Sequence, residues 1–201
     1  MTGPRVWLGG EGPTELGGLA GHPSYHDPND HGVLQTLVLT LNPNAEICGA
    51  TVWSKIHKYA SGAARASSRA RQEPVESLAV RRLCLTAEEA GADVVVFARD
   101  RDAFAERDEQ IEAGMLAVRA EARVRVGGGM AVRAIEAWTL LVLGDARGEH
   151  YADPKTILDA KHGKSCAHQC RALSADDALA RVPKDSHFHE WLESVRAALG
   201  G

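Results

Sequence analysis

The chain has 201 residues, of which 44% are hydrophobic and 25% are charged, so it is long enough for one domain with a substantial core. Its formal net charge of −4 argues against a protein that coats a nucleic-acid duplex through a general excess of basic residues. No stretch reaches the roughly 18 apolar residues that a membrane helix requires, and the first residues lack the apolar core of a signal peptide. We therefore expect a cytoplasmic protein without a membrane span.

A short apolar segment near the N-terminus, residues 5–9, ends in glycines and predicts a buried first strand. The segment that follows, Glu11-Gly-Pro-Thr-Glu15, combines a permissive glycine with a proline of fixed φ and predicts a loop. This loop would display the carboxylates of Glu11 and Glu15 at the carboxyl end of the strand. Ligands of open α/β sheets bind at that edge.

Residues 17–32 have no apolar period and are rich in Gly, Pro, His, Asp and Asn, which indicates an irregular insertion before a helix at 33–41. The side chains in this insertion that suit a metal are His22, His26, Asp27, Asp30 and His31. Their spacing matches no standard zinc pattern, so a polar surface loop is the simpler interpretation. The role of the segment from His22 to His31 is left open.

A β-rich segment at 47–53 predicts the second strand, and residues 76–91 predict a helix. Between and across these elements, from Lys55 to Arg82, basic residues outnumber acidic ones. Three arginines of this segment are candidates for nucleic-acid binding: Arg65, Arg69 and Arg71. A solvated loop and helix face is the other interpretation of the same charges.

The clearest strand covers residues 93–98, where a continuous β-branched and aromatic run is typical of a strand buried on both faces of a parallel sheet. It is followed by Arg99-Asp-Arg-Asp102. Because residues i and i+2 of a strand point to one face, Asp100 and Asp102 would converge if the strand continued that far. Mg²⁺ prefers carboxylate and water oxygens, so this pair is a candidate metal platform. Alternatively, Asp102 only caps the next helix while Asp100 lies in a turn.

The second half of the chain is predicted to be mainly helical. Residues 103–122 predict a crossover helix, residues 123–126 a last strand, and Gly127-Gly-Gly129 a loop. Four further helical segments are expected, at 131–143, from Asp153-Pro154 onward, at 177–182 and at 187–199. The fold class is therefore α/β, a mostly parallel central sheet of about four strands flanked by helices, with a helical C-terminal extension. We divide it into an α/β domain at 1–145 and a helical extension at 146–201 packed on that domain.

The four cysteines are scattered along the chain and are interpreted as free thiols. Cys166-Ala-His-Gln-Cys170 brings three metal-binding side chains close together, but it lacks the second pair of ligands that a structural zinc site requires. The role of this segment is also left open.

The order of these motifs resembles the TOPRIM domain, which topoisomerases, bacterial primases, recombination-repair proteins and nucleases of the OLD type share. The resemblance is carried by Glu11-Gly12 after the first strand and by Asp100-Arg-Asp102 after the later one. Three longer elements look more like small, stand-alone bacterial TOPRIM-like proteins, often encoded beside ATPases in defence loci: Glu11-Gly-Pro-Thr-Glu15, Ile135-Glu136-Ala-Trp138 and Asp153-Pro-Lys155. The resemblance runs from Arg5 to about Lys155.

The resemblance implies that Glu11 acts as general acid or base while Asp100 and Asp102 hold Mg²⁺ or Mn²⁺. Glu15 and Glu136 match positions that could hold a second metal. Two metals about 3.5–4 Å apart would activate water and stabilise the leaving oxygen in phosphodiester cleavage. Each residue also has a structural interpretation, since Glu15 suits a first helical turn and Glu136 suits a buried ion pair.

Lys155 would contact phosphate in such an enzyme, although a lysine on a helix surface is the simpler interpretation. Arg99 and Arg101 flank the metal aspartates and depart from the family pattern, either neutralising the acidic cluster or contacting the nucleic-acid backbone.

The function that we expect is a divalent-metal-dependent nuclease or related phosphotransfer enzyme acting on DNA or RNA, with a role in antiphage defence implied by the resemblance. The alternative is a non-catalytic TOPRIM-like subunit that assembles with an ATPase partner. A third interpretation is a small-molecule metalloenzyme that uses the histidines between residues 22 and 31. Homo-oligomerisation is left open.

Overall fold

A computed structural model of the chain describes residues 3–20, 30–56, 74–101, 104, 106–163 and 166–200. Within them, four parallel strands form one sheet in the order β2-β1-β3-β4. The strands are β1 (Arg5–Gly10), β2 (Glu46–Val52), β3 (Val94–Asp100) and β4 (Arg125–Ala131). The predicted α/β class, with a parallel sheet of about four strands and a helical C-terminal part, is confirmed.

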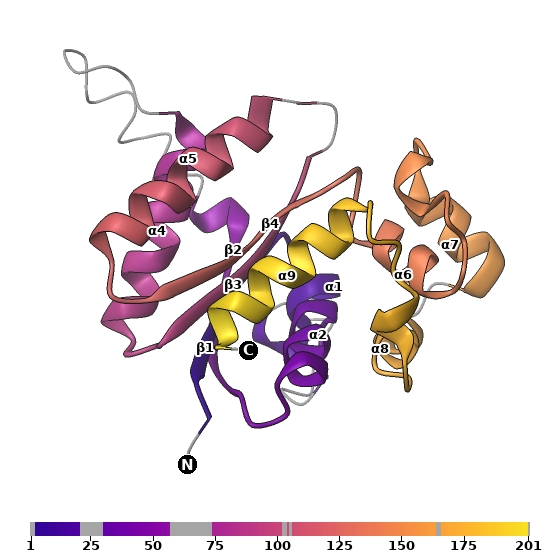
Figure 1. The fold of residues 1–201 in the computed structure, drawn as a ribbon, viewed down its shortest axis with the longest axis horizontal. Helices are drawn as coiled ribbons and strands as arrows, with labels where there is room; N and C mark the ends of the chain where they lie inside the picture. The colour runs from indigo at the N-terminus through magenta and orange to yellow at the C-terminus, as the bar shows by residue number, and fades with distance from the viewer. Residues whose placement is uncertain are drawn as a thin grey trace.

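Helices cover both faces of the sheet (Figure 1). Those described are α1 (Pro13–Leu16), α2 (Val33–Leu41), α4 (Val75–Glu89), α5 (Glu106–Glu121), α6 (Glu136–Val142), α7 (Pro154–His162), α8 (Cys166–Leu173) and α9 (His187–Leu199). Short 3₁₀ turns lie at Gly17–Ala20, Gly148–His150 and Ala178–Arg181. No helix in the described part of the chain is long and apolar enough to cross a membrane.

Strand β3 is buried on both faces, as its continuous apolar run predicts. Alternate side chains point to opposite faces of a strand, so Val94 and Val96 join the core beneath α2 and α9. Val95 and Phe97 join a second core beneath α4 and α5. Strand β3 is therefore fixed by packing from two sides.

The predicted helix at 33–41 has the same bounds as α2. Helix α7 begins as expected at Asp153-Pro154, because the Asp153 carboxylate accepts the N–H of Thr156 at 3.0 Å and Pro154 occupies the first helical position. The bounds of α2 and the start of α7 could both be predicted from short local sequence patterns.

The prediction of a last strand at 123–126 followed by a glycine loop is wrong. Strand β4 continues through Gly127-Gly-Gly129 to Ala131, and α6 begins only at Glu136. The glycines permit close packing: a Cβ at Gly127 would lie 2.8 Å from the Cβ of Ala198 on α9, and one at Gly128 would lie 2.1 Å from the Phe97 carbonyl oxygen. Gly128 also has a φ of +128°, which L side chains rarely adopt.

The C-terminal helix α9 completes the core of the sheet. The Trp191 indole N–H donates to the Phe97 carbonyl of β3 at 2.9 Å, and Trp138 stacks on Phe188 with ring centroids 4.7 Å apart. One core cluster therefore contains residues on both sides of position 145. The division into units at 1–145 and 146–201 remains a prediction.

Candidate carboxylate site at the sheet edge

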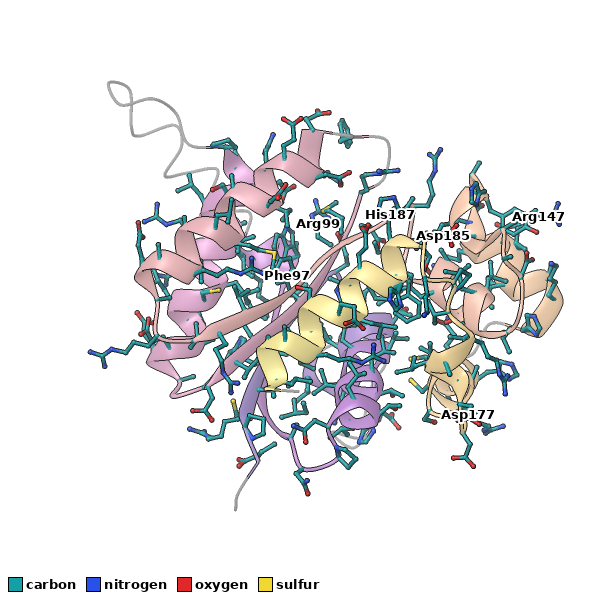
Figure 2. All side chains as sticks on the ribbon, in the orientation of Figure 1. Phe97, Arg99, Arg147, Asp177, Asp185 and His187 are labelled. Atoms are coloured by element: carbon teal, nitrogen blue, oxygen red, sulfur yellow. The ribbon has the colours of Figure 1, made fainter. Side chains whose placement is uncertain are left out.

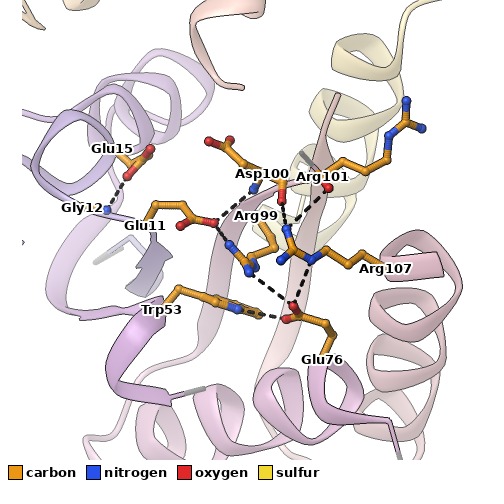
Figure 3. Close-up of polar contacts among 9 residues, drawn as sticks. All are labelled: Glu11, Gly12, Glu15, Trp53, Glu76, Arg99, Asp100, Arg101 and Arg107. Carbon is orange, nitrogen blue, oxygen red and sulfur yellow. Dashed lines mark hydrogen bonds and ion pairs between the residues drawn. The ribbon is translucent and has the colours of Figure 1, made fainter. Parts of the chain in front are cut away.

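Glu11 and Asp100 meet at the carboxyl edge of the sheet. Strands β1 and β3 are neighbours, Glu11 follows the last residue of β1, and Asp100 is the last residue of β3. The backbone N–H of Asp100 lies 3.4 Å from Glu11 Oε1 (Figure 3). The sequence predicts this proximity, because both residues come at the carboxyl ends of parallel strands, which share one edge of the sheet. Asp102, their expected companion, lies outside the described residues.

The Glu11 carboxylate forms an ion pair with the guanidinium of Arg99. Arg99 is buried and also pairs with Glu76 of α4 at 3.3 Å. Its guanidinium lies 5.8 Å from the ring centroid of Trp53, whose indole N–H donates to Glu76 at 3.0 Å. Of the two roles expected for Arg99, the structure therefore favours charge neutralisation at the sheet edge.

A second arginine, Arg107 of α5, extends this network. Its Nε lies 3.3 Å from Glu76 Oε1, and one terminal nitrogen donates to the carbonyl oxygen of Asp100 at 3.0 Å. Arg101 turns away and pairs with Asp108 at 3.1 Å. Two arginines thus converge on the buried Glu76 and fix the backbone where β3 ends.

Sequence reasoning missed Glu76 and Arg107 as parts of this edge. Glu76 was assigned only to the start of a helix, yet it shares a helix face with the buried Val80 and Leu83 at spacings of four and seven residues. A carboxylate in an apolar stripe is the signal that would have pointed to it.

Glu15 lies in the single turn of α1, a helix where a loop was predicted. Its carboxylate accepts the N–H of Gly12 at 2.5 Å, and the residue is only 6% exposed. The pKa of Glu15 is raised from 4.5 to about 7, chiefly by burial and also by the nearby charge of Glu136, while the Gly12 hydrogen bond and the charge of Lys155 oppose the rise. Glu15 can therefore exchange a proton near neutral pH.

Glu136 is the second buried carboxylate of this region, and its charge repels that of Glu15. It lies in the first turn of α6 and is 7% exposed. In the described part of the chain, no side chain or backbone group forms a hydrogen bond or ion pair with its carboxylate. Two buried carboxylates from distant parts of the sequence thus lie close enough to repel each other.

The candidate phosphate-binding residues are only partly described. Lys155 is exposed in the first turn of α7, and its charge reaches Glu15. The other candidates lie outside the described residues: Arg65, Arg69 and Arg71. Of the histidine-containing insertion, Asp30 and His31 are described, whereas His22, His26 and Asp27 are not.

The two cysteines of α8 border the same region. Their sulfur atoms are 3.9 Å apart, and Cys166 Sγ lies 3.5 Å from the carbonyl oxygen of Thr14, next to Glu15. His168 instead stacks on His162 of α7, with ring centroids 6.1 Å apart. The described geometry does not combine the three side chains of Cys166-Ala-His-Gln-Cys170 into one site.

The donor set suits a hard divalent cation such as Mg²⁺ or Mn²⁺, because all of its candidate ligands are carboxylates. The buried Glu15 and Glu136 fit such an ion best, since a dication would offset the repulsion between them. Within the described residues, no three His, Cys, Asp or Glu side chains are grouped closely enough to hold a metal as they stand. Glu11, held by Arg99, would have to reorient before it could serve as a ligand.

A comparison of the chain with protein-family models, with curated proteins and with solved structures gives no match. The TOPRIM resemblance therefore stays a prediction from short motifs.

Proposed function

We propose that the chain is a divalent-metal-dependent nuclease, or a related phosphotransfer enzyme, that acts on DNA or RNA. The observation that carries this proposal is the buried pair of Glu15 and Glu136 beside the ends of β1 and β3, where Glu11 and Asp100 emerge. Burying two like charges is costly, and such arrangements concentrate at functional sites.

Glu15 and Glu136, together with Asp100 and Asp102, would hold Mg²⁺ or Mn²⁺. When bound, the metal supplies an activated water and charge stabilisation for a leaving oxygen. Glu15, with its pKa near 7, can take up or release a proton at a carboxylate oxygen at neutral pH. Glu11 is positioned by Arg99 at the same edge and remains the proposed general acid or base.

Substrate contact is proposed for four basic residues. Lys155 is exposed in the first turn of α7 and its charge lowers the pKa of Glu15, and the candidates outside the described residues are Arg65, Arg69 and Arg71. A polyanionic substrate needs such cations because the carboxylates themselves repel phosphate. A role in antiphage defence is proposed from the motif resemblance alone.

The second candidate function is a non-catalytic subunit that assembles with an ATPase. The observation that favours it is the ion pair between Glu11 and Arg99, because the proposed catalytic carboxylate is already neutralised by a cation of the protein itself. In this case the acidic edge would serve assembly, and the site would have lost its chemistry.

Metal binding and cleavage, measured on the same samples, test the proposal. We expect the wild-type chain to bind Mn²⁺ in calorimetry and to cleave plasmid DNA or RNA, and Glu136→Gln and Asp100→Ala/Asp102→Ala to lose both. Glu106→Gln, an exposed glutamate in the first turn of α5, is the matched control and should behave like wild type. Metal binding without cleavage would favour the second candidate, and wild-type protein without metal affinity would contradict the nuclease proposal.

A further inference from the structure

A groove follows the free edge of the sheet. Strand β4 is an end strand of the sheet, and in Figure 1 its open side lies between α5 and α9. A cavity of about 390 Å³ borders its carboxyl half and another of about 510 Å³ borders its amino half. Both are lined by Arg119 of α5 and Ser194 of α9, so the two cavities adjoin at these two residues.

The charges along this groove are polarised. Its carboxyl end is lined by the acidic residues Asp108, Glu112 and Glu190, of which Asp108 pairs with Arg101 and Glu190 lies 3.3 Å from His187 at the start of α9 (Figure 2). Its amino end is lined by the basic residues Arg119, Arg123 and Arg125. A surface that is acidic at one end and basic at the other is complementary to its own antiparallel copy.

Helix α5 carries this polarity in one stripe. Glu112, Leu116 and Arg119 are spaced by four and three residues, so they share a helix face, and all three line the groove. With a rise of about 1.5 Å per residue, Glu112 lies about 6 Å before Leu116 and Arg119 about 4.5 Å after it. Leu116 is 57% exposed, one of the few large apolar side chains on the described surface.

An added β-strand fits the groove less well than a helix does. The outward N–H of Gly128 already donates to the Ser194 hydroxyl at 3.1 Å, and Val126 is only 5% exposed. A strand that paired with β4 would have to displace α9 from this edge. Contact through the exposed face of α5 requires no such change.

We propose that this groove is the interface of a homodimer, in which α5 packs antiparallel against α5 of a second copy across a two-fold axis at Leu116. In this arrangement, Glu112 of each copy faces Arg119 of the other, and the two Leu116 side chains meet at the axis. The interface is independent of the proposed enzymatic activity, because it contains none of the carboxylates proposed for catalysis or metal binding at the carboxyl ends of the strands.

Sedimentation and light scattering from micromolar to submillimolar concentration test the dimer. We expect the wild-type chain to dimerise, and Glu112→Arg and Arg119→Glu each to weaken association by at least about tenfold, because each places like charges opposite one another twice. The double variant Glu112→Arg/Arg119→Glu restores complementarity and should dimerise like wild type. A mixture of the two single variants should form the heterodimer.

Glu89→Arg is the matched control, since it makes the same charge change at an exposed position, the last residue of α4, that does not line the groove. It should dimerise like wild type. Leu116→Cys should form an intermolecular disulfide under mild oxidation. A wild-type chain that stays monomeric throughout, or single variants that associate like wild type, would overturn the proposal and leave the groove to a different partner.

Discussion

The substitution Glu15→Gln isolates the cost of the buried carboxylate. Glutamine keeps the shape of the side chain and an oxygen that can accept the N–H of Gly12. It removes the titratable proton and the negative charge, and it replaces the second oxygen with an amide NH₂ group. Because Glu15 has a raised pKa, the folded protein holds this proton more tightly than the unfolded chain does. Its contribution to stability is therefore fully present below pH 4.5 and is lost as the pH rises through about 7.

The magnitude follows from the interval between the two pKa values. An interval from 4.5 to about 7 corresponds to about 3 kcal/mol, since each pH unit is worth about 1.4 kcal/mol. The side chain is only 6% exposed, so solvent screens this effect little. Relative to wild type, Glu15→Gln should therefore gain about 3 kcal/mol of unfolding free energy between pH 4.5 and pH 8.

Urea unfolding at a series of pH values, in the presence of a chelator, measures this difference. Glu106→Gln, which removes an exposed carboxylate of α5, should follow the wild-type curve across the same range. If the curves of wild type and Glu15→Gln run parallel between pH 4.5 and pH 8, Glu15 is not a proton-binding group of the folded state, and the reasoning about the buried pair is refuted.

Three further outcomes are expected. Glu76→Ala would leave the buried Arg99 and the partly buried Arg107 without their shared carboxylate and should cost about 3–5 kcal/mol in urea unfolding. A loss below about 1 kcal/mol, the value of an exposed pair, would contradict the network. Gly127→Ala places a Cβ against α9 and should lower stability by about 1–3 kcal/mol in thermal unfolding, whereas an unchanged melting temperature would show that the helix can shift freely. The pKa of Cys170 is lowered to about 7 by its contact with the thiol of Cys166, whereas burial raises the pKa of Cys84 to about 12. Cys170 should therefore react with iodoacetamide at neutral pH much faster than Cys84. Equal rates of modification, measured by peptide mass spectrometry, would contradict this.

Much of the fold could be predicted because it is written in local patterns. The continuous apolar run before Arg99 predicts a strand that is buried on both faces. Asp153-Pro154 predicts a helix start, because the Asp153 side chain caps the first turn and Pro154 fits its first position. The meeting of Glu11 and Asp100 also followed, because the ends of adjacent parallel strands share one edge.

The partners of the edge residues could not be predicted in the same way. Glu11 and Arg99 are separated by 88 residues, and Arg99 and Glu76 by 23, so nothing in their neighbouring sequence indicates which carboxylate each cation contacts. Glu15 and Glu136 were both expected at the site from the motif resemblance. Burial of Glu136 was one of the interpretations of the sequence, but the burial of Glu15 and the repulsion between the two carboxylates emerged only from the tertiary packing of α1 and α6.

The sequence by itself determined the α/β class, the strand that centres the sheet and the edge at which the acidic residues gather. Only the tertiary structure decided that Gly127-Gly-Gly129 continues a strand, because the need for glycine there comes from the approach of α9 and β3. It also decided which charges are neutralised and which repel. The physical reason is that hydrophobic periodicity and backbone preference act over a few residues, whereas burial and electrostatic partners depend on side chains that the chain brings together from far apart.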